Sequence, residues 1–160
     1  MQKMIRGSTV TGREYMHKEC VAETTIDIFE DIVETYNLKT KIISENEVAF
    51  VSSNYVLVIF IEHFGISISY STKEELPDMY YCDDFFAEAY DDEDRKGLEA
   101  GEDAKTRIRN ELIVASRGLV SKWENVLKGD TTWIEDFKKS MWYSKHSQPK
   151  VDSSIFKASN

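Results

Sequence analysis

The sequence predicts an α+β fold: an N-terminal helix, an antiparallel meander of three to four strands, then a long helix and a short C-terminal helix packed on the sheet. Three observations lead to this class. Apolar residues recur at three-and-four spacing toward both ends, the region between them changes to the two-residue period of strands, and a length of 160 residues suits one domain. The order of helix, strands and helices is typical of an α+β architecture.

The domain is expected to span residues 11–147. Residues 1–10 show no apolar period, so they are expected to form a loose arm. Residues 148–160 are polar and contain Pro149, so they are expected to form a tail. The longest apolar run, Val56–Ile61, is far shorter than the roughly 20 residues of a membrane-spanning helix. No membrane or signal segment is expected, and a cytoplasmic location is favoured.

The first helix is expected to begin at a capping box in which Thr11 and Glu14 satisfy each other's free backbone donors. Asn37 is a suitable residue for its end. The positions expected to face the sheet lie three and four residues apart: Tyr15, Ala22, Ile26, Phe29, Val33 and Tyr36.

Four candidate strands follow, at Lys41–Ser44, Glu47–Ser52, Tyr55–Glu62 and Ile66–Ser71. The third of them, with the sequence YVLVIFIE, is apolar on both faces and is expected to be a central strand covered on each side. The fourth alternates apolar residues with Ser67, Ser69 and Ser71, which predicts one face in contact with water.

Pro77 is expected to end the strand region, and the aromatic segment Tyr80–Tyr90 is expected to form a short helix. The long helix is expected to start at Glu102 and to end at Lys128 and Gly129, a favourable terminal charge and a left-handed cap. Its apolar stripe consists of Ala104, Ile108, Leu112, Ala115, Leu119, Trp123 and Val126.

A last short helix is expected after a second capping box, Thr132 with Glu135, and its apolar positions are Trp133, Phe137 and Met141. Sheet and helices are expected to share one core. That core is centred on Val48, Phe50, Val56, Val58, Phe60, Ile66 and Ile68, packed against Leu112, Leu119 and Trp123.

The chain is acidic, because 29 carboxylates against 20 Lys and Arg give a net charge of −9. Nucleic-acid phosphates and anionic lipids repel such a chain, so no nucleic-acid or membrane partner is expected. The segment Asp83–Asp103 holds ten carboxylates against Arg95 and Lys96, a net charge of −8 within 21 residues. A charged partner is therefore expected to be basic.

Aromatic residues accompany this acidic segment, and protein interfaces favour aromatic anchors beside charge. The expected partner-binding residues are Asp84, Phe86, Glu88, Tyr90, Asp91, Asp92, Glu93 and Asp94. A solvated loop that contributes only solubility is the alternative. A calcium-binding loop is disfavoured, because Lys96 would stand at a ligand position.

No motif supplies a nucleophile, a base and an orienting group together, so the protein is not expected to be an enzyme or to hold a metal or cofactor. The histidines His17, His63 and His146 lack the paired spacing of zinc ligands. Cys20 and Cys82 lack metal-type spacing as well. Two reduced thiols are expected, and a single long-range disulfide is the alternative.

Two stretches, NEVAFVSSNYVLVIFIEHFGISISYS at residues 46–71 and LVSKWENVLKGDTTWIEDFKKSMWYS at residues 119–144, lie in this order behind an N-terminal helix. In layout the chain resembles the small α+β immunity proteins of bacterial polymorphic toxin systems, including those of contact-dependent growth inhibition. The resemblance covers about a third of the chain and includes no diagnostic motif. It implies a cytoplasmic protein that binds a cognate toxin domain tightly and blocks its active site or substrate path.

The sequence thus favours an immunity protein that binds and neutralises a cognate, basic toxin, for instance a nuclease. Two alternatives stay open. One is an enzyme whose site is assembled from scattered residues, which a deep pocket lined by carboxylates with strongly shifted pKa values would favour. The other is a phage or plasmid inhibitor that mimics nucleic acid, which requires carboxylates along one face at phosphate-like spacing.

Overall fold

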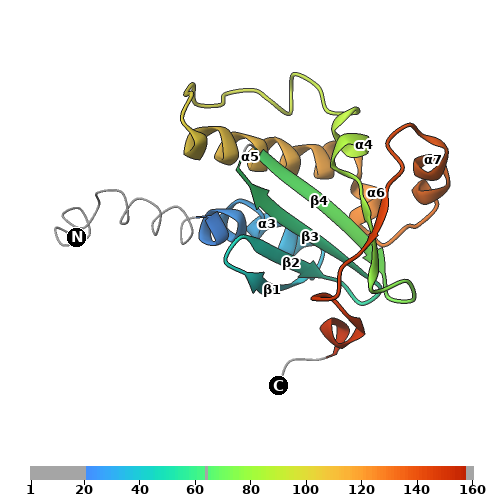
Figure 1. The fold of residues 1–160 in the computed structure, drawn as a ribbon. Coiled ribbons are helices and arrows are strands. Elements are labelled where there is room, and N and C mark those ends of the chain that lie inside the picture. The colour runs from blue at the N-terminus through green and yellow to red at the C-terminus, as the bar shows by residue number, and fades with distance from the viewer. Residues whose placement is uncertain (1–20, 64, 158–160) are drawn as a thin grey trace, which may run out of the picture.

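One antiparallel sheet of six strands forms the middle of the fold (Figure 1). The computed structural model describes residues 21–63 and 65–157. The strands pair in chain order and are β1 (Lys39–Ser44), β2 (Glu47–Val51), β3 (Tyr55–Glu62), β4 (Gly65–Thr72), β5 (Asp78–Tyr81) and β6 (Lys145–Ser147). Every pairing is antiparallel. The predicted α+β class and antiparallel meander are confirmed, with two strands more than the four expected.

Residues 21–28 are helical, and an irregular turn at Phe29 separates them from the next helix. The further helices are α3 (Glu30–Thr35), α4 (Asp83–Ala87), α5 (Ala104–Lys122), α6 (Glu124–Leu127), α7 (Trp133–Lys139) and the 3-10 helix η1 (Ser153–Phe156). The long helix α5 is confirmed, but it ends at Lys122 because Trp123 leaves helical geometry, with φ −128° and ψ 32°. Asn37 has φ 57° and Gly129 has φ 93°, the left-handed conformations expected at the ends of helices.

Alternation along β3 sends its side chains into two separate clusters. Tyr55 and Leu57 are buried in the main core beneath the helices, together with Leu112 of α5. Val56 and Val58 are buried on the opposite face. The prediction that this strand is covered on both sides is confirmed. The single core expected from the sequence is wrong, because a strand with two apolar faces cannot direct both toward one helix layer.

The segment after β6 supplies the second cover. Val151 is fully buried and Ile155 nearly so, and both contact the face that carries Val56 and Val58. Glu47 of β2 is 4% exposed there, and Lys150 reaches its Oε1 over 3.1 Å. The described part of the predicted polar tail therefore belongs to the fold. Three large apolar residues, Val151, Ile155 and Phe156, are too few among polar ones to show a period.

Strand β5 replaces the start of the short helix predicted at Tyr80–Tyr90. Tyr80 is buried in the main core, and its hydroxyl donates to Glu75 Oε2 over 2.6 Å. The helix begins only at Asp83, as α4. Strand β6 completes the edge by pairing with β5 from a distant part of the chain. A pairing between such separated segments leaves no local signal in the sequence.

The water-exposed face predicted for β4 is wrong. Ser67, Ser69 and Ser71 are 7%, 6% and 0% exposed. The Ser71 hydroxyl donates to the Asp78 carbonyl over 2.7 Å, which satisfies it inside the fold. Alternation of serine with apolar residues indicated the pleat of the strand correctly, but it did not reveal that neighbouring segments cover both faces.

The ends of the last helices also differ from expectation. Thr132 makes no side-chain capping bond to α7; the Asp130 carboxylate instead accepts the Thr132 amide over 2.9 Å. Met141 lies beyond the end of α7 and is 84% exposed. Helix α5 begins at Ala104, two residues after the expected Glu102, because the Asp103 carboxylate caps it by accepting the Thr106 amide over 2.7 Å.

The predicted arm, the Thr11 capping box, His17 and Cys20 lie outside the described residues. Cys82 is a free thiol, fully buried in the main core. In the described ranges no helix is both long and apolar enough to cross a membrane.

Leu112→Ala is expected to lower the free energy of unfolding by about 2–5 kcal/mol, because Leu112 is fully buried between α5 and the sheet. Urea unfolding measures the change. Ile42→Ala, at a position 60% exposed, is the control and should cost under about 0.5 kcal/mol. Equal effects at the two positions would mean that α5 does not cover the sheet.

Candidate functional site

The acidic segment runs back along helix α5 and is attached to it at three points (Figure 1). Toward the C-terminal end of α5, the Asp94 carboxylate accepts a hydrogen bond from Ser121. Closer to its start, Asn110 donates to the Glu99 carbonyl over 2.9 Å. At the start itself, Asp103 is the N-cap. The segment is therefore a fixed part of the surface.

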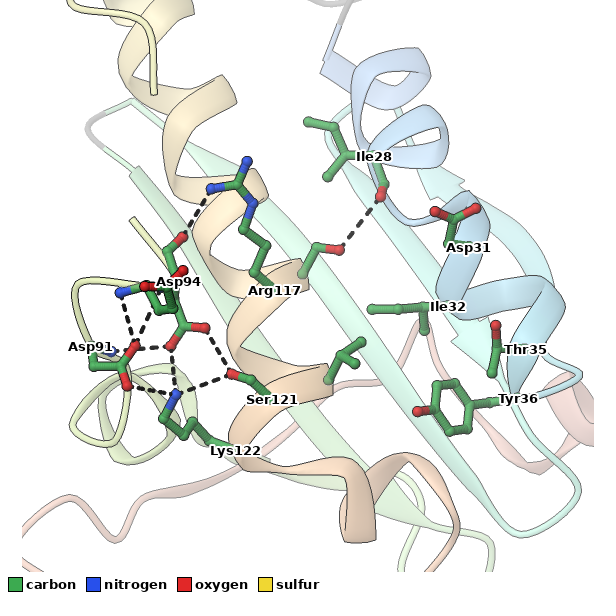
Figure 2. Close-up of a pocket in the computed structure, with 13 residues that line it drawn as sticks. Ile28, Asp31, Ile32, Thr35, Tyr36, Asp91, Asp94, Arg117, Ser121 and Lys122 are labelled. Carbon is green, nitrogen blue, oxygen red and sulfur yellow. Dashed lines mark hydrogen bonds and ion pairs between the residues drawn. The ribbon is translucent and has the colours of Figure 1, made fainter. Parts of the chain in front are cut away.

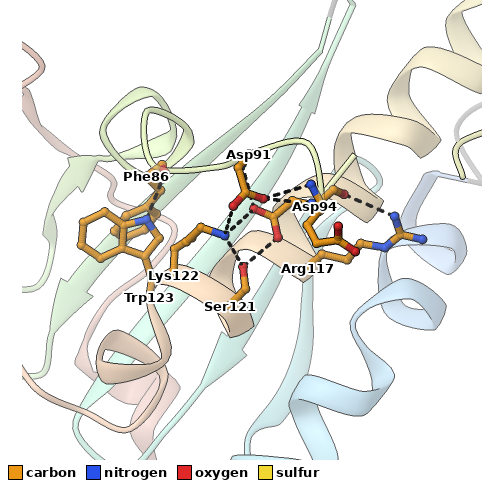
Figure 3. Close-up of polar contacts among 8 residues, drawn as sticks. Phe86, Asp91, Asp94, Arg117, Ser121, Lys122 and Trp123 are labelled. Atoms are coloured by element: carbon orange, nitrogen blue, oxygen red, sulfur yellow. Dashed lines mark hydrogen bonds and ion pairs between the residues drawn. The ribbon is translucent and has the colours of Figure 1, made fainter. Parts of the chain in front are cut away.

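Asp94 is the buried centre of these contacts, with a side chain only 4% exposed (Figure 3). Its carboxylate accepts hydrogen bonds from Ser121 Oγ at 2.7 Å, Lys122 Nζ at 3.1 Å and the Asp91 amide at 3.0 Å. Burial by itself raises the pKa of Asp94, but the three donors outweigh it and hold the pKa below its usual value. Asp94 is thus ionised at neutral pH.

Asp91 and Arg117 complete the attachment. The Lys122 ammonium lies 2.9 Å from the Asp91 carboxylate, and this contact lowers the pKa of Asp91. Arg117 donates from Nη1 to the backbone carbonyls of Asp94 at 3.3 Å and Lys96 at 2.6 Å (Figure 3). The two cations of α5 therefore hold the backbone and the buried carboxylate of the acidic segment.

Five carboxylates of the segment have side chains exposed to water. Side chains of Asp91 and Glu93 are 53% and 79% exposed. Asp84, Glu88 and Asp92 are exposed as well. We call these five residues the acidic surface. Lys96 lies 3.8 Å from Glu93 but is itself 75% exposed, so water screens this pair strongly.

The two aromatic residues predicted as anchors lie inside the fold. Phe86 is fully buried, and its carbonyl accepts a hydrogen bond from Trp123 Nε1 over 3.0 Å. Tyr90 is half-buried, and its ring lies so close to Gly118 that a Cβ there would overlap it. Of the eight predicted residues, five are exposed, Tyr90 is half-buried, and Phe86 and Asp94 are buried.

A groove lies next to the acidic surface, between α3 and α5 (Figure 2). Its volume is about 550 Å³. Asp31 of α3 and Tyr36, the C-cap residue of α3, line it on one side, and Val120 lines it from α5. Asp91 and Glu93 of the acidic surface form part of its rim. The charges and this concavity therefore belong to one continuous region.

The Cys82 thiol and the His146 ring are both held by contacts within the fold. Burial raises the pKa of the Cys82 thiol well above its usual value, so it stays protonated and unreactive. His146 stacks on Tyr81 at 3.7 Å between ring centroids, and burial lowers its pKa. No group of three or more His, Cys, Asp or Glu in the described part of the chain can hold a metal ion.

Sequence reasoning missed the cations that organise the site. Arg117, Ser121 and Lys122 lie on α5 away from its apolar stripe, where polar residues usually face only water. The four-residue spacing of Arg117 and Ser121 shows that they share a helix face. Nothing local indicates that the acidic segment folds back onto this face. Val120 and Asp31 were also missed, because nothing local indicates that α3 and α5 border one groove.

Comparison of the chain with protein-family models, with curated proteins and with solved structures finds no match.

Asp94→Asn is expected to lower the free energy of unfolding at pH 7 by about 1–3 kcal/mol, because Asn keeps the shape but loses the charge that binds Lys122. The folded pKa of Asp94 lies below the ordinary 3.8. The stabilisation is therefore present above that value and is lost as the pH falls through the folded pKa. Urea unfolding from pH 7 down to pH 3 should show the variant and the wild type converging.

The control for this experiment is Asp92→Asn in the same loop. Asp92 is exposed, so its substitution should change the free energy of unfolding by less than about 0.5 kcal/mol. A wild-type advantage over Asp94→Asn that stays constant down to pH 3 would show that the charge of Asp94 is not what stabilises the loop.

Gly118→Ala is expected to lower the free energy of unfolding by about 1–3 kcal/mol, because its Cβ would overlap the Tyr90 ring and push the acidic segment off α5. Tyr90→Phe is the companion variant. The Tyr90 hydroxyl is buried without a hydrogen-bond partner, so removing it should leave stability unchanged or slightly higher. Thermal unfolding of both variants measures these changes in stability. A Gly118→Ala variant as stable as the wild type would refute the contact between Gly118 and Tyr90.

Proposed function

We propose that the protein is an immunity protein that binds a basic toxin domain through the acidic surface and neutralises it. The observation that carries the proposal is the internal attachment of the loop: buried Asp94 and the cations of α5 fix the backbone. Asp92 and Glu93 are thereby held on an ordered scaffold with their charges toward solvent. Asp84 lies in α4 and Glu88 is its C-cap, and the buried Phe86 ties this helix to the core. A partner that meets fixed charges loses less conformational freedom on binding than one that must order a loop.

The concentration of charge also supports a basic partner. The segment carries a net charge of −8, and the attachments use Lys122 and Arg117 against Asp91, Asp94 and backbone carbonyls. The exposed carboxylates keep their attraction for a partner. Charge complementarity of this kind raises association rates by roughly 10- to 1,000-fold at low salt.

Burial of Phe86 changes the mechanism expected from the sequence. A fully buried ring in the main core cannot insert into a partner, so the acidic surface accounts for the approach of a toxin and not for its retention. The apolar contacts that slow dissociation must lie elsewhere on the same side of the molecule.

The acidic surface can be tested with a fourfold variant, Asp84→Asn, Glu88→Gln, Asp92→Asn and Glu93→Gln. With the toxin encoded beside this gene, its association rate is expected to fall at least about 10-fold at low salt and to depend less on salt. Stability should hold, because Asp94 and Asp91 are retained. Stopped-flow mixing over a salt series measures the rates.

A matched control changes the net charge equally on other surfaces: Glu23→Gln, Glu34→Gln, Glu62→Gln and Glu74→Gln, all exposed carboxylates. It is expected to keep most of the wild-type association rate. Equal slowing by both fourfold variants would show that only net charge matters and that the acidic surface has no special role.

The function itself is tested by coexpression. The product of the neighbouring gene is expected to stop growth of a host strain, and coexpression of this protein is expected to restore it. If the product of the neighbouring gene is toxic and this protein neither binds nor neutralises it, the proposal is refuted.

A further inference from the structure

The groove between α3 and α5 is built from two helix rows that face each other at the same spacing. On one side are Ile28, Ile32 and Tyr36, each four residues from the next. On the other side, Ser116 and Val120 of α5 line the groove. Glu124, the first residue of α6, lies four residues farther along the chain. Residues four apart on a helix lie on one face, and Figure 2 shows Ile28, Ile32 and Tyr36 on the side that faces α5.

Hydrogen bonds join the two rows at both ends. Ser116 Oγ donates to the Ile28 carbonyl over 3.5 Å, and the Tyr36 hydroxyl donates to Glu124 Oε2 over 2.6 Å. Burial and this short bond raise the pKa of Tyr36 to about 12, so the hydroxyl keeps its proton. The two connections are eight helical residues apart, which corresponds to about 12 Å. We call the space between them the slot.

The middle of the slot is apolar and open. Ile32 is 2% exposed and forms part of the main core, whereas Val120 is 43% exposed. The neighbouring apolar residues Ala115 and Leu119 on α5 are buried under the fold. The groove lined by Val120 and Ile32 has a volume of about 550 Å³. The exposed Val120 therefore offers a contact surface for an apolar side chain of a partner.

The rim of the slot is negative. Asp31 lies on the α3 side, and Asp91 and Glu93 of the acidic surface line the groove from the far side of α5 (Figure 2). The two cations nearby are already engaged: Lys122 contacts Asp91 and Asp94, and Arg117 donates to backbone carbonyls. The rim therefore favours a positively charged residue, while the floor favours an apolar one.

We propose that the slot binds a short amphipathic, cationic segment of the toxin, an inference that rests on the function proposed above. An apolar side chain of that segment packs on Ile32 and Val120, and a Lys or Arg beside it lies against Asp31 and Glu93. About two helical turns fit between the two connections, which matches recognition by anchors four residues apart. The slot supplies the apolar retention that the acidic surface lacks.

The first test uses a synthetic probe. The probe is a fluorescent 14-residue amidated peptide of Leu and Lys, with Leu at helical three-and-four spacing. Fluorescence anisotropy is expected to show binding to the wild type. A Leu→Ser version of the same charge should bind at least 10-fold more weakly, because it has no apolar side chain for the slot.

The critical comparison is between Val120→Lys and Ile42→Lys. Both replace an exposed apolar residue, 43% and 60% exposed, and both change the net charge equally. Val120→Lys is expected to lower the affinity for the Leu and Lys peptide at least 10-fold. Ile42→Lys is expected to lower this affinity less than 2-fold. No binding of the peptide, or equal weakening by the two variants, overturns the slot. Matching thermal unfolding curves exclude loss of the fold.

The second test uses the toxin encoded beside this gene. Val120→Lys is expected to increase its dissociation rate at least 10-fold while changing its association rate less than 3-fold, since apolar anchors act mainly after encounter. Asp31→Lys should act in the same direction. A toxin that dissociates from Val120→Lys at the wild-type rate overturns the slot but leaves the immunity function standing. Peptide binding that depends on Val120, together with failure to neutralise the toxin, refutes the function and retains the slot.

Discussion

The central strand β3 is apolar on both faces, and the rest of the structure depends on covering it twice. Burial of apolar surface contributes roughly 25 cal/mol per Å², so leaving either face in water would be costly. Helices α3 and α5 cover the face of Tyr55 and Leu57. The segment around Val151 and Ile155 covers the other face. The chain thus folds as three layers, and the last layer comes from a stretch that looks polar in the sequence.

Gathering the larger helices on one face has a direct consequence for function. Helix α5 and α3 lie beside each other, and the slot opens between them where their rows are joined only at the ends (Figure 2). The acidic segment then returns along the other side of α5. Charge and concavity meet because both border the same helix. Long-range attraction and short-range apolar contact can therefore act on one partner from one side of the molecule.

Within the acidic segment, residues of the same chemical type have opposite roles. Asp94 is ionised and buried, where Ser121 and Lys122 stabilise its charge, and it shapes the loop. Asp92 and Glu93 are its close neighbours in the sequence, yet their side chains are exposed and do not attach the loop to α5. A row of carboxylates in a sequence carries no information about which one faces a lysine. The eight predicted residues therefore include a buried structural carboxylate, Asp94, together with exposed ones such as Asp92 and Glu93.

By itself the sequence determined the class of fold, the four strands of the first meander, the long helix and the concentration of negative charge. These features follow from local periodicity and composition, which neighbouring residues reveal directly. The tertiary structure alone decided that β5 and β6 extend the sheet, that Val151 covers its second face, and that Phe86 is core. It also decided that Val120 stays exposed opposite Ile32. Each of these depends on segments far apart in the chain meeting in space, and their burial and pairing energies have no signature in the local pattern of residues.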